Sequence, residues 1–424
     1  MLNSSLLFFK TNMIETDLCI IGAGPAGMMA AIAAAERSGK IIILESNTTA
    51  GRKLLLTGRG RCNLTHTGSA DEIIKAFKPF DRFVRHCIYE FPPQKLRNFF
   101  RRRGLETVEE PDGCVFPKSQ RSSDVKQILT EELKKPDIRI LYGKKAQSVR
   151  KDRDVFIILS EKFAISAKSL IIATGGASWP QTGSTGDGCR FAESLGHKII
   201  EPKASVVPLV TAEKFCSSLA GIGIEKVEIS CKIDGKKISL SGPMMFTHNG
   251  IGGPAVLDLS RFITDRLSEK HSVELSIDLL PDITHKQLDK KLTEDLMQYP
   301  KRNIASTIAQ YTPKALAEII CSNYKFTDII AGQFTKKDRM TLIETLKNFR
   351  LIAVSADLLE TATVTRGGVD TSQIDCKTMQ SKLCENLFFA GEVINIDGPC
   401  GGYNLQFAFS SGFLAGKSAV ESLK

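Results

Sequence analysis

Short apolar runs recur near both ends of the chain, and they predict buried strands. Residues 16–21 form the first run, an alanine-rich helical stretch follows at 28–37, and residues 40–44 form the second run. Uninterrupted apolar runs of this length are typical of strands that are covered on both faces in a parallel sheet. Further strands are predicted at 138–149, 155–159, 164–165, 169–172 and 386–389, and a helix is predicted at 404–422.

A glycine motif, Gly22-Ala23-Gly24-Pro25-Ala26-Gly27, follows the first run at once. Gly22 suits a tight turn, Gly24 lets backbone amides approach a pyrophosphate, and Gly27 allows close packing of helix on sheet. The amino end of the next helix presents free N–H groups and a positive dipole end. Glu45 ends the second run, where a carboxylate can accept hydrogen bonds from ribose hydroxyls. The motif therefore predicts dinucleotide binding, because a turn without a ligand leaves Gly27 and Glu45 unexplained.

The middle of the chain has a different pattern. Residues 205–280 indicate short strands with turn signals such as Asp234-Gly235, and the following segment is charged, leucine-spaced and poor in glycine, with breaks at Pro300 and Pro313. The sequence thus predicts an α/β fold in which a Rossmann-like domain is split by an insert, and we expect the two to share an active-site cleft. The predicted ranges are 1–200 and 350–424 for the Rossmann-like domain and 201–349 for the insert, with a small β part at 205–280 and a helical part at 284–348.

Composition narrows the class of protein. Hydrophobic residues make up 42% and charged residues 25%, as in ordinary globular proteins, and no apolar run approaches the ~20 residues of a spanning helix. The apolar start has no basic residues ahead of it and no clear cleavage site, so we do not interpret it as a signal peptide; Met13 is an alternative start to Met1. The eleven cysteines are scattered without a CxxC pair, which favours reduced thiols, a cytoplasmic protein and no metal site.

The net charge of +10 admits two interpretations, a solvated surface or a polyanionic partner such as nucleic acid. Two basic clusters carry much of the second hypothesis, because such clusters can contact phosphates. The first has no acid between its members and the second has only Asp152; they comprise Lys95, Arg97, Arg101, Arg102 and Arg103, and Lys144, Lys145, Arg150, Lys151 and Arg153.

Longer motifs carry a resemblance that covers nearly the whole chain. The stretches 51–65, 183–188, 246–254 and 401–406 resemble the BaiN/RdsA-like flavoproteins, also called the aminoacetone oxidase family. The turn Ala173-Thr174-Gly175-Gly176 and the pair Gly391-Glu392 are similar to the FAD-binding fold of two-dinucleotide-binding-domain flavoproteins. In that fold the first turn lies near the cofactor, a Gly-Asp pair binds the ribityl and pyrophosphate region, and the last helix points its amino end at the flavin. Glu392 here replaces the usual Asp, and Arg59 stands where the family usually has a small residue.

The resemblance implies FAD as the cofactor, held by turns after strands and by a basic, glycine-rich loop at 52–63. An ordinary basic surface loop is the alternative for that segment. There is no second GxGxxG, so NAD(P)H, as a possible reductant, would bind transiently at the flavin face. The predicted FAD contacts are Gly22, Ala23, Gly24, Pro25, Ala26, Gly27, Glu45, Ser46, Arg52, Lys53, Thr57, Gly58, Arg61, Asn63, Thr174, Gly175, Gly176, Gly391, Glu392, Asn404 and Leu405.

Candidates for catalysis are fewer. Cys62 is either a proton donor to a reduced substrate or a small buried apolar side chain. His248 either meets substrate or only fixes its loop through a hydrogen bond. Arg366, before Gly367-Gly368, and Tyr403 are the predicted substrate contacts, and the glycine pair suggests close approach of backbone to a ligand.

One loop is predicted to serve a helix rather than the reaction. Asp187 is a good N-cap for a helix that runs to Leu195, with Gly196 as its stop.

Three functions compete. The first is reduction of a conjugated C=C bond with a flavin hydride, on substrates that the family resemblance extends from steroid-like enones to uridine in ribosomal RNA, which would make RNA the partner. The second, also implied by the family, is oxidation of small amines or aminoketones by oxygen. The third is a non-enzymatic FAD-binding protein, against which the many glycines near the flavin-side motifs argue.

Overall fold

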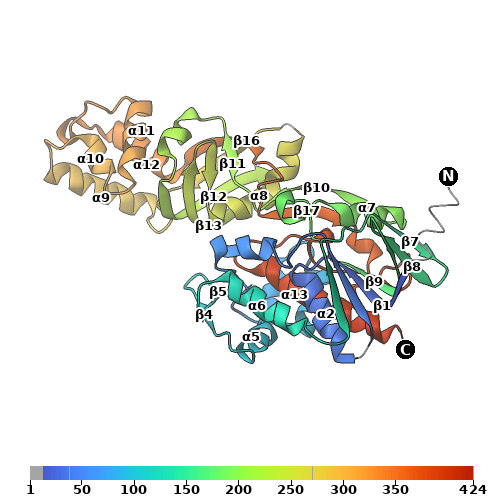
Figure 1. Ribbon diagram of the computed structural model, residues 1–424. Coiled ribbons are helices and arrows are strands. Elements are labelled where there is room, and N and C mark those ends of the chain that lie inside the picture. The colour runs from blue at the N-terminus through green and yellow to red at the C-terminus, as the bar shows by residue number, and fades with distance from the viewer. Residues whose placement is uncertain (1–12, 38, 270, 424) are drawn as a thin grey trace. The chain divides into compact units, whose positions relative to one another are not determined.

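The computed structural model describes residues 13–37, 39–269 and 271–423 (Figure 1). Met1 lies outside the described residues, so the choice between Met1 and Met13 stays a prediction. The chain forms two compact units: one contains the chain up to Lys203 together with the chain from Leu359, and the other is Ala204–Leu358. Each unit has a hydrophobic core of its own.

A seven-stranded sheet forms the centre of the first unit. Its order is β6-β2-β1-β9-β8-β7, and β18 pairs with the carboxyl half of β9 while β8 pairs with the amino half. Five strands run parallel, whereas β7 and β8 form an antiparallel hairpin. The predicted strands are confirmed, with the runs 164–165 and 169–172 joined in the single strand β9. They are β1 (Met13–Ile21), β2 (Ile41–Glu45), β6 (Ile138–Tyr142), β7 (Ser148–Asp152), β8 (Val155–Leu159), β9 (Ala164–Ile172) and β18 (Leu387–Phe389).

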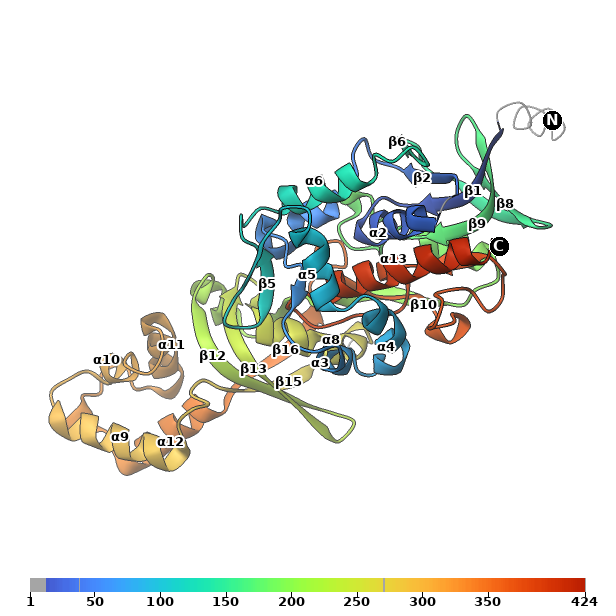
Figure 2. The same ribbon diagram turned by 90° about the horizontal axis from the view of Figure 1, so that it is seen from below.

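Two helices, α2 (Pro25–Ala34) and α13 (Tyr403–Glu421), lie side by side in this unit (Figures 1 and 2). Their backbones touch: a Cβ at Gly412 would lie 2.2 Å from the Ala26 carbonyl oxygen, and one at Gly416 2.0 Å from that of Ala30. From the first contact to the second, the residue number rises by four in both helices, so the helices run parallel and their amino ends point the same way.

Smaller elements surround this core. Two further sheets, β3-β5-β4 and β10-β17, belong to the first unit or to its border with the second. The remaining elements are α3 (Ala70–Ala76), α4 (Asp81–Glu90), α5 (Pro93–Arg101), α6 (Ser122–Glu132), α7 (Asp187–Ser194), β3 (Thr65–His66), β4 (Thr107–Glu109), β5 (Cys114–Pro117), β10 (Ile199–Ser205) and β17 (Val364–Val369).

The second unit contains a closed six-stranded barrel in the order β11-β14-β13-β12-β15-β16. Helix α8 packs on the barrel strands, and the helices from α9 to α12 gather at one end of it (Figure 1). Bounds are β11 (Leu209–Thr211), β12 (Gly223–Ile233), β13 (Lys236–Thr247), β14 (Gly250–Gly252), β15 (Val273–Asp278), β16 (Phe349–Ala356), α8 (Pro254–Ser268), α9 (His285–Gln298), α10 (Ile304–Ile308), α11 (Lys314–Tyr324) and α12 (Lys336–Lys347).

The predicted boundary at 349/350 is corrected by β16. This strand pairs with β15 on one side and with β11 on the other, so the barrel closes only through it. Phe349, Leu351 and Ala353 are buried while the residues between them are exposed, as expected of a barrel strand. The compact units accordingly divide at Leu358/Leu359.

Among the described residues, no helix has the length and apolar character needed to cross a bilayer.

Candidate dinucleotide and redox site

The predicted nucleotide-binding turns meet at one edge of the parallel sheet. Strands β2, β1, β9 and β18 are neighbours in that order and run the same way, so their carboxyl ends lie along the same edge. The residues that follow these ends are Gly22 after β1, Thr174 to Gly176 after β9, and Gly391 after β18, while Glu45 ends β2 itself. Ligands of open α/β sheets bind outside this edge.

The three glycines of the first turn have different surroundings. Gly22 has a φ of +104°, and an added Cβ would lie 2.5 Å from the Ala173 carbonyl oxygen. A Cβ at Gly27 would lie 2.0 Å from the Gly22 carbonyl oxygen, whereas one at Gly24 would meet no atom within 4 Å. Gly22 and Gly27 therefore permit close packing, and Gly24 leaves the amino end of α2 open. No side chain caps that end, so its first N–H groups are available to an anion, which fits a pyrophosphate.

The Glu45 carboxylate is buried, with 6% of the residue exposed, and its oxygens face the backbone. Oε2 accepts from the Ala23 amide at 2.9 Å, and Oε1 accepts from the Asn47 amide and side chain at 2.8 and 2.7 Å. Ser46 lies beside it and is exposed. The carboxylate thus fixes the glycine turn to the loop after β2. The Asn47 side-chain oxygen also accepts a hydrogen bond from Arg52 at 2.7 Å. In the sequence, Asn47 is marked only by its position two residues after Glu45.

The amino end of α13 is the second open helix end. Gly402, with φ of +93°, is its N-cap residue, and no side chain caps it. Because α13 runs parallel to α2, both positive dipole ends point toward the same side. The Asn404 amide is engaged elsewhere, since it bonds the backbone of Gly398 and Pro399. The adjacent Leu405 is half-buried.

Lys53 connects the basic loop to the carboxyl-terminal motif. Its Nζ lies 2.9 Å from Glu392 Oε2 and 2.7 Å from Ser178 Oγ. Glu392 Oε1 accepts from the Thr365 amide at 2.6 Å. The carboxylate in place of the usual Asp therefore faces protein donors. Sequence reasoning missed Ser178 and Thr365, which stand in no motif that would mark them.

The other basic residues of the loop differ in their partners. Arg61 pairs with Glu110 at 2.6 Å and lies over the Phe116 ring. Arg59 is exposed, with φ of +57°. The loop contains the segment η2 (Lys53–Gly60), in which 3-10 turns are interrupted by a kink at Thr57, Gly58 and Arg59, and the Thr57 hydroxyl donates to the Leu54 carbonyl. The remaining loop residues, Gly58 and Asn63, are half-buried, and Asn63 accepts from the Val115 amide.

Cys62 lies within the protein, 0% exposed. Burial raises the pKa of its thiol to about 12, although a hydrogen bond with Thr57 opposes the shift. Its backbone has a φ of +66°, and its amide donates to the Thr57 carbonyl at 2.9 Å. A thiol covered on all sides has no surface for a substrate, so the geometry favours the packing alternative over proton donation.

The other predicted reaction residues come from both units. Tyr403 opens α13, and its ring stacks on His66 with centroids 4.8 Å apart. Arg366 lies half-buried on β17. His248 is exposed in the two-residue turn between β13 and β14, in the second unit. Tyr403 therefore belongs to the α13 end of the first unit, and His248 belongs to the second unit.

Two interpretations of the sequence are corrected. The pair Gly367-Gly368 approaches protein backbone rather than a ligand: added Cβ atoms would lie 2.5 Å from the Glu201 oxygen and 2.3 Å from the Val393 oxygen. Asp187 is the first residue of α7, and Gly186 is the N-cap, because the left-handed φ of +75° at Gly186 turns the chain into the helix.

Asp187 nevertheless stabilises the start of α7 through its side chain. Partial burial raises the pKa of this carboxyl, but hydrogen bonds with Lys145, Thr185 and Arg190 outweigh burial and hold the pKa below its ordinary value.

The parallel sheet, the open glycine turn and the paired helix ends define an FAD-dependent oxidoreductase, and comparisons with known proteins agree. The chain belongs to the HI0933-like protein Rossmann domain family, which matches residues 16–418. The predicted family resemblance, α/β fold and FAD cofactor are thereby confirmed.

Similar proteins span nearly the whole chain. A ribosomal RNA dihydrouridine synthase of Escherichia coli is 28% identical over 96% of this chain and 99% of its own length. The enzyme of that name from Haemophilus influenzae is 30% identical, covering 93% and 96%. A 3-dehydro-bile acid delta(4,6)-reductase of Clostridium scindens is 29% identical, covering 95% and 98%.

Solved structures share the fold alone. The Mycobacterium smegmatis Sdh1 complex is 13% identical with a TM-score of 0.53, over 97% of this chain and 68% of that one. A 3-ketosteroid delta1-dehydrogenase of Sterolibacterium denitrificans is 11% identical with a TM-score of 0.52, over 96% and 100%.

Proposed function

We propose that this protein reduces a conjugated carbon–carbon double bond and that its substrate is uridine in ribosomal RNA. One observation carries the proposal: relatives of nearly full length are named for two unlike substrates but for one bond change. Dihydrouridine arises when the uridine C5=C6 bond, conjugated with the C4 carbonyl, is reduced. A bile acid delta(4,6)-reductase is named for the corresponding change in a steroid.

In this proposal the chain binds and orients FAD through the residues at the sheet edge. The open N–H groups of α2, next to Gly24, bind the pyrophosphate. Glu45 Oε2, which accepts one protein hydrogen bond from the Ala23 amide, accepts a second from the adenosine ribose. Lys53 and Glu392 hold the basic loop against the turn after β18, and the amino end of α13 faces the flavin. FAD held there, once reduced by NAD(P)H, would supply a hydride to one carbon of the double bond, and a proton would complete the other carbon. Tyr403 and Arg366 are the proposed substrate contacts.

A small enone is the second candidate substrate, supported by the bile acid relative at 29% identity. Identities of 28% to 30% do not separate the two substrates. The net charge of +10 favours the polyanion, because basic surface attracts phosphates. NAD(P)H, binding transiently beside the flavin, is the proposed reductant.

The experiment measures each half-reaction without oxygen. NADPH or NADH should bleach the flavin, and a uridine-containing ribosomal RNA fragment should restore its colour with formation of dihydrouridine. RNA from cells that lack the gene should contain less dihydrouridine than RNA from complemented cells. Bleaching by aminoacetone instead, with no response to NAD(P)H, would replace this proposal by the oxidase. Reoxidation by a steroid enone but not by RNA would establish the small-molecule candidate.

A further inference from the structure

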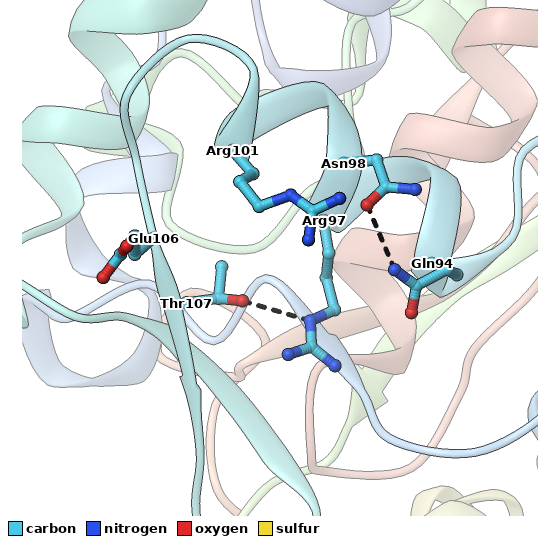
Figure 3. Close-up of a pocket in the computed structure, with 6 residues that line it drawn as sticks. All are labelled: Gln94, Arg97, Asn98, Arg101, Glu106 and Thr107. Carbon is cyan, nitrogen blue, oxygen red and sulfur yellow. Dashed lines mark hydrogen bonds between the residues drawn. The ribbon is translucent and has the colours of Figure 1, made fainter.

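Helix α5 carries a polar face opposite its buried face. Leu96 and Phe100 are buried in the core of the first unit. Four polar residues recur at spacings of three and four along the other face, so they form one stripe. With the residue before β4 and the first residue of β4 they line a cavity of about 230 Å³ (Figure 3). The six lining residues are Gln94, Arg97, Asn98, Arg101, Glu106 and Thr107.

Two of the three charged side chains that line this cavity pair with a group of opposite charge, and among the described residues the third does not. Arg97 pairs with Glu109 at 2.6 Å and donates to Thr107 Oγ1 at 3.1 Å. Glu106 pairs with Lys118 at 2.8 Å. Across the part of the chain that the structure describes, no acid pairs with Arg101, which is exposed. One guanidinium with its donors therefore remains available at the cavity.

The size and lining of the cavity restrict its ligand. Pockets for drug-sized ligands measure about 300–1,000 Å³ and are mostly apolar. This cavity is smaller and every residue lining it is polar, which suits a single anionic group better than an apolar steroid skeleton. Arginine forms short, paired hydrogen bonds with phosphate oxygens. Gln94 Nε2 donates to Asn98 Oδ1 at 3.1 Å, and the Asn98 side-chain nitrogen adds further donors (Figure 3).

We propose that this cavity binds a backbone phosphate of the RNA substrate, with Arg101 as the principal contact. This inference rests on the proposed function. The cavity belongs to the same unit as the redox site, and α5 packs on α13: the Phe100 and Phe409 ring centroids are 6.0 Å apart. A phosphate held on α5 thus fixes the RNA to the unit whose α13 end carries Tyr403.

Several of the other basic residues are engaged within the protein. Arg103 pairs with Glu132 at 2.6 Å and lies over the Phe99 ring at 3.8 Å. In the second cluster, Lys145 pairs with Asp187 at 2.7 Å and Arg150 with Asp152 at 3.4 Å. The first cluster contains no acid along the sequence, but acids from other segments pair with two of its arginines in the fold. Mutating Arg103 would disturb packing, whereas Arg101 lines the cavity and pairs with no acid among the described residues, so Arg101 is the informative position.

The test compares Arg101→Gln with Arg139→Gln, a matched control on β6 whose arginine is also exposed. Binding of a single-stranded ribosomal RNA fragment to the oxidised holoenzyme is measured from low to high salt. Wild type and the control should show the same dependence of log K on log salt. Arg101→Gln should bind more weakly, with a slope smaller by ~0.7 for one lost phosphate contact. FAD content and reduction of a small enone should stay at the wild-type level.

Equal slopes for Arg101→Gln and Arg139→Gln would overturn the inference, as would a wild type that does not bind the fragment. Equal slopes leave the proposed function standing if the enzyme still forms dihydrouridine in RNA, whereas a wild type that does not bind RNA but reduces an enone would establish the small-molecule candidate. Failure to reduce both RNA and enone would instead refute the proposed function, whatever the binding data show.

Discussion

Gly24 differs from the other glycines of its motif in facing open space. Its φ of −77° and ψ of −179° are accessible to valine, and an added Cβ meets no protein atom within 4 Å. Gly24→Val should therefore fold like wild type but crowd the pyrophosphate, so the purified protein should lack FAD. Flavin absorbance per chain and the melting temperature check this expectation.

The matched variant is Gly27→Val, whose Cβ would lie 2.0 Å from the Gly22 oxygen. It should lose stability as well as FAD, because the helix must move from the sheet. Full FAD occupancy in folded Gly24→Val would show that this turn does not bind the pyrophosphate.

For a Cys62 variant we predict a loss of stability without a loss of catalysis. A lost general acid would slow the step from reduced flavin to substrate by ~10²–10⁴-fold. Because the thiol is fully buried, Cys62→Ala should leave that step within a few-fold of wild type and instead lower stability by about 1 kcal/mol. Stopped-flow oxidation of the reduced enzyme and chemical unfolding measure the two effects separately. A slow step in a variant of normal stability would return Cys62 to catalysis.

Part of the site was predictable at residue level because it follows from spacing along the chain. The glycine turn and Glu45 lie within one strand–helix–strand unit, whose geometry is local. Ser178 and Thr365 were not predictable, since they reach Glu392 from distant segments. The pair Gly367-Gly368 shows the same limit: glycine signals a close approach but does not say what approaches.

At the scale of elements, the contact of α2 with α13 sets the direction of both helix ends. In a helix open to solvent, Gly→Ala stabilises by about 1 kcal/mol. At Gly416 the added methyl would lie 2.0 Å from the Ala30 oxygen, so Gly416→Ala should instead destabilise, by about 1–3 kcal/mol. Denaturant unfolding measures whether the free energy of unfolding rises or falls, and Ser418→Ala, which adds no atom, is the control. A stabilised Gly416→Ala would refute the tight contact.

The start of α7 gives a pH-dependent prediction. Asp187 has a pKa below its ordinary 3.8, so its contribution to stability is present above that value and is lost as pH falls through the folded-state pKa. Asp187→Asn should therefore melt below wild type near neutral pH, and the difference should shrink in acid. Asp154→Asn, an exposed acid in the β7–β8 turn, should show little difference at either pH. A difference that persists unchanged in acid would refute the charged contacts.

At the scale of the molecule, the parallel sheet followed from apolar runs, whereas the barrel did not. Its strands alternate, and β12 and β13 are 11 and 12 residues long, not short as the turn signals indicated. Closure depends on β16, which pairs with β11 across some 140 residues of chain. Residues 349–356 carry no local sequence signal of this pairing, so the predicted domain boundary falls before β16 instead of after it.

The two separate cores lead to the last prediction. All proposed FAD contacts lie in the first unit, whose core is distinct from that of the barrel unit. A ligand at 100 times its Kd stabilises what it binds by about 2.7 kcal/mol. Adding FAD to apoprotein should therefore slow amide hydrogen exchange in α2, α13 and β1, while exchange in β12, β15 and the helices from α9 to α12 stays unchanged. Gly24→Val apoprotein given the same FAD is the control and should show no slowing in either unit. Equal slowing in the barrel core of wild type would mean that FAD binding is shared by both units, and the assignment of the site to the first unit alone would be wrong.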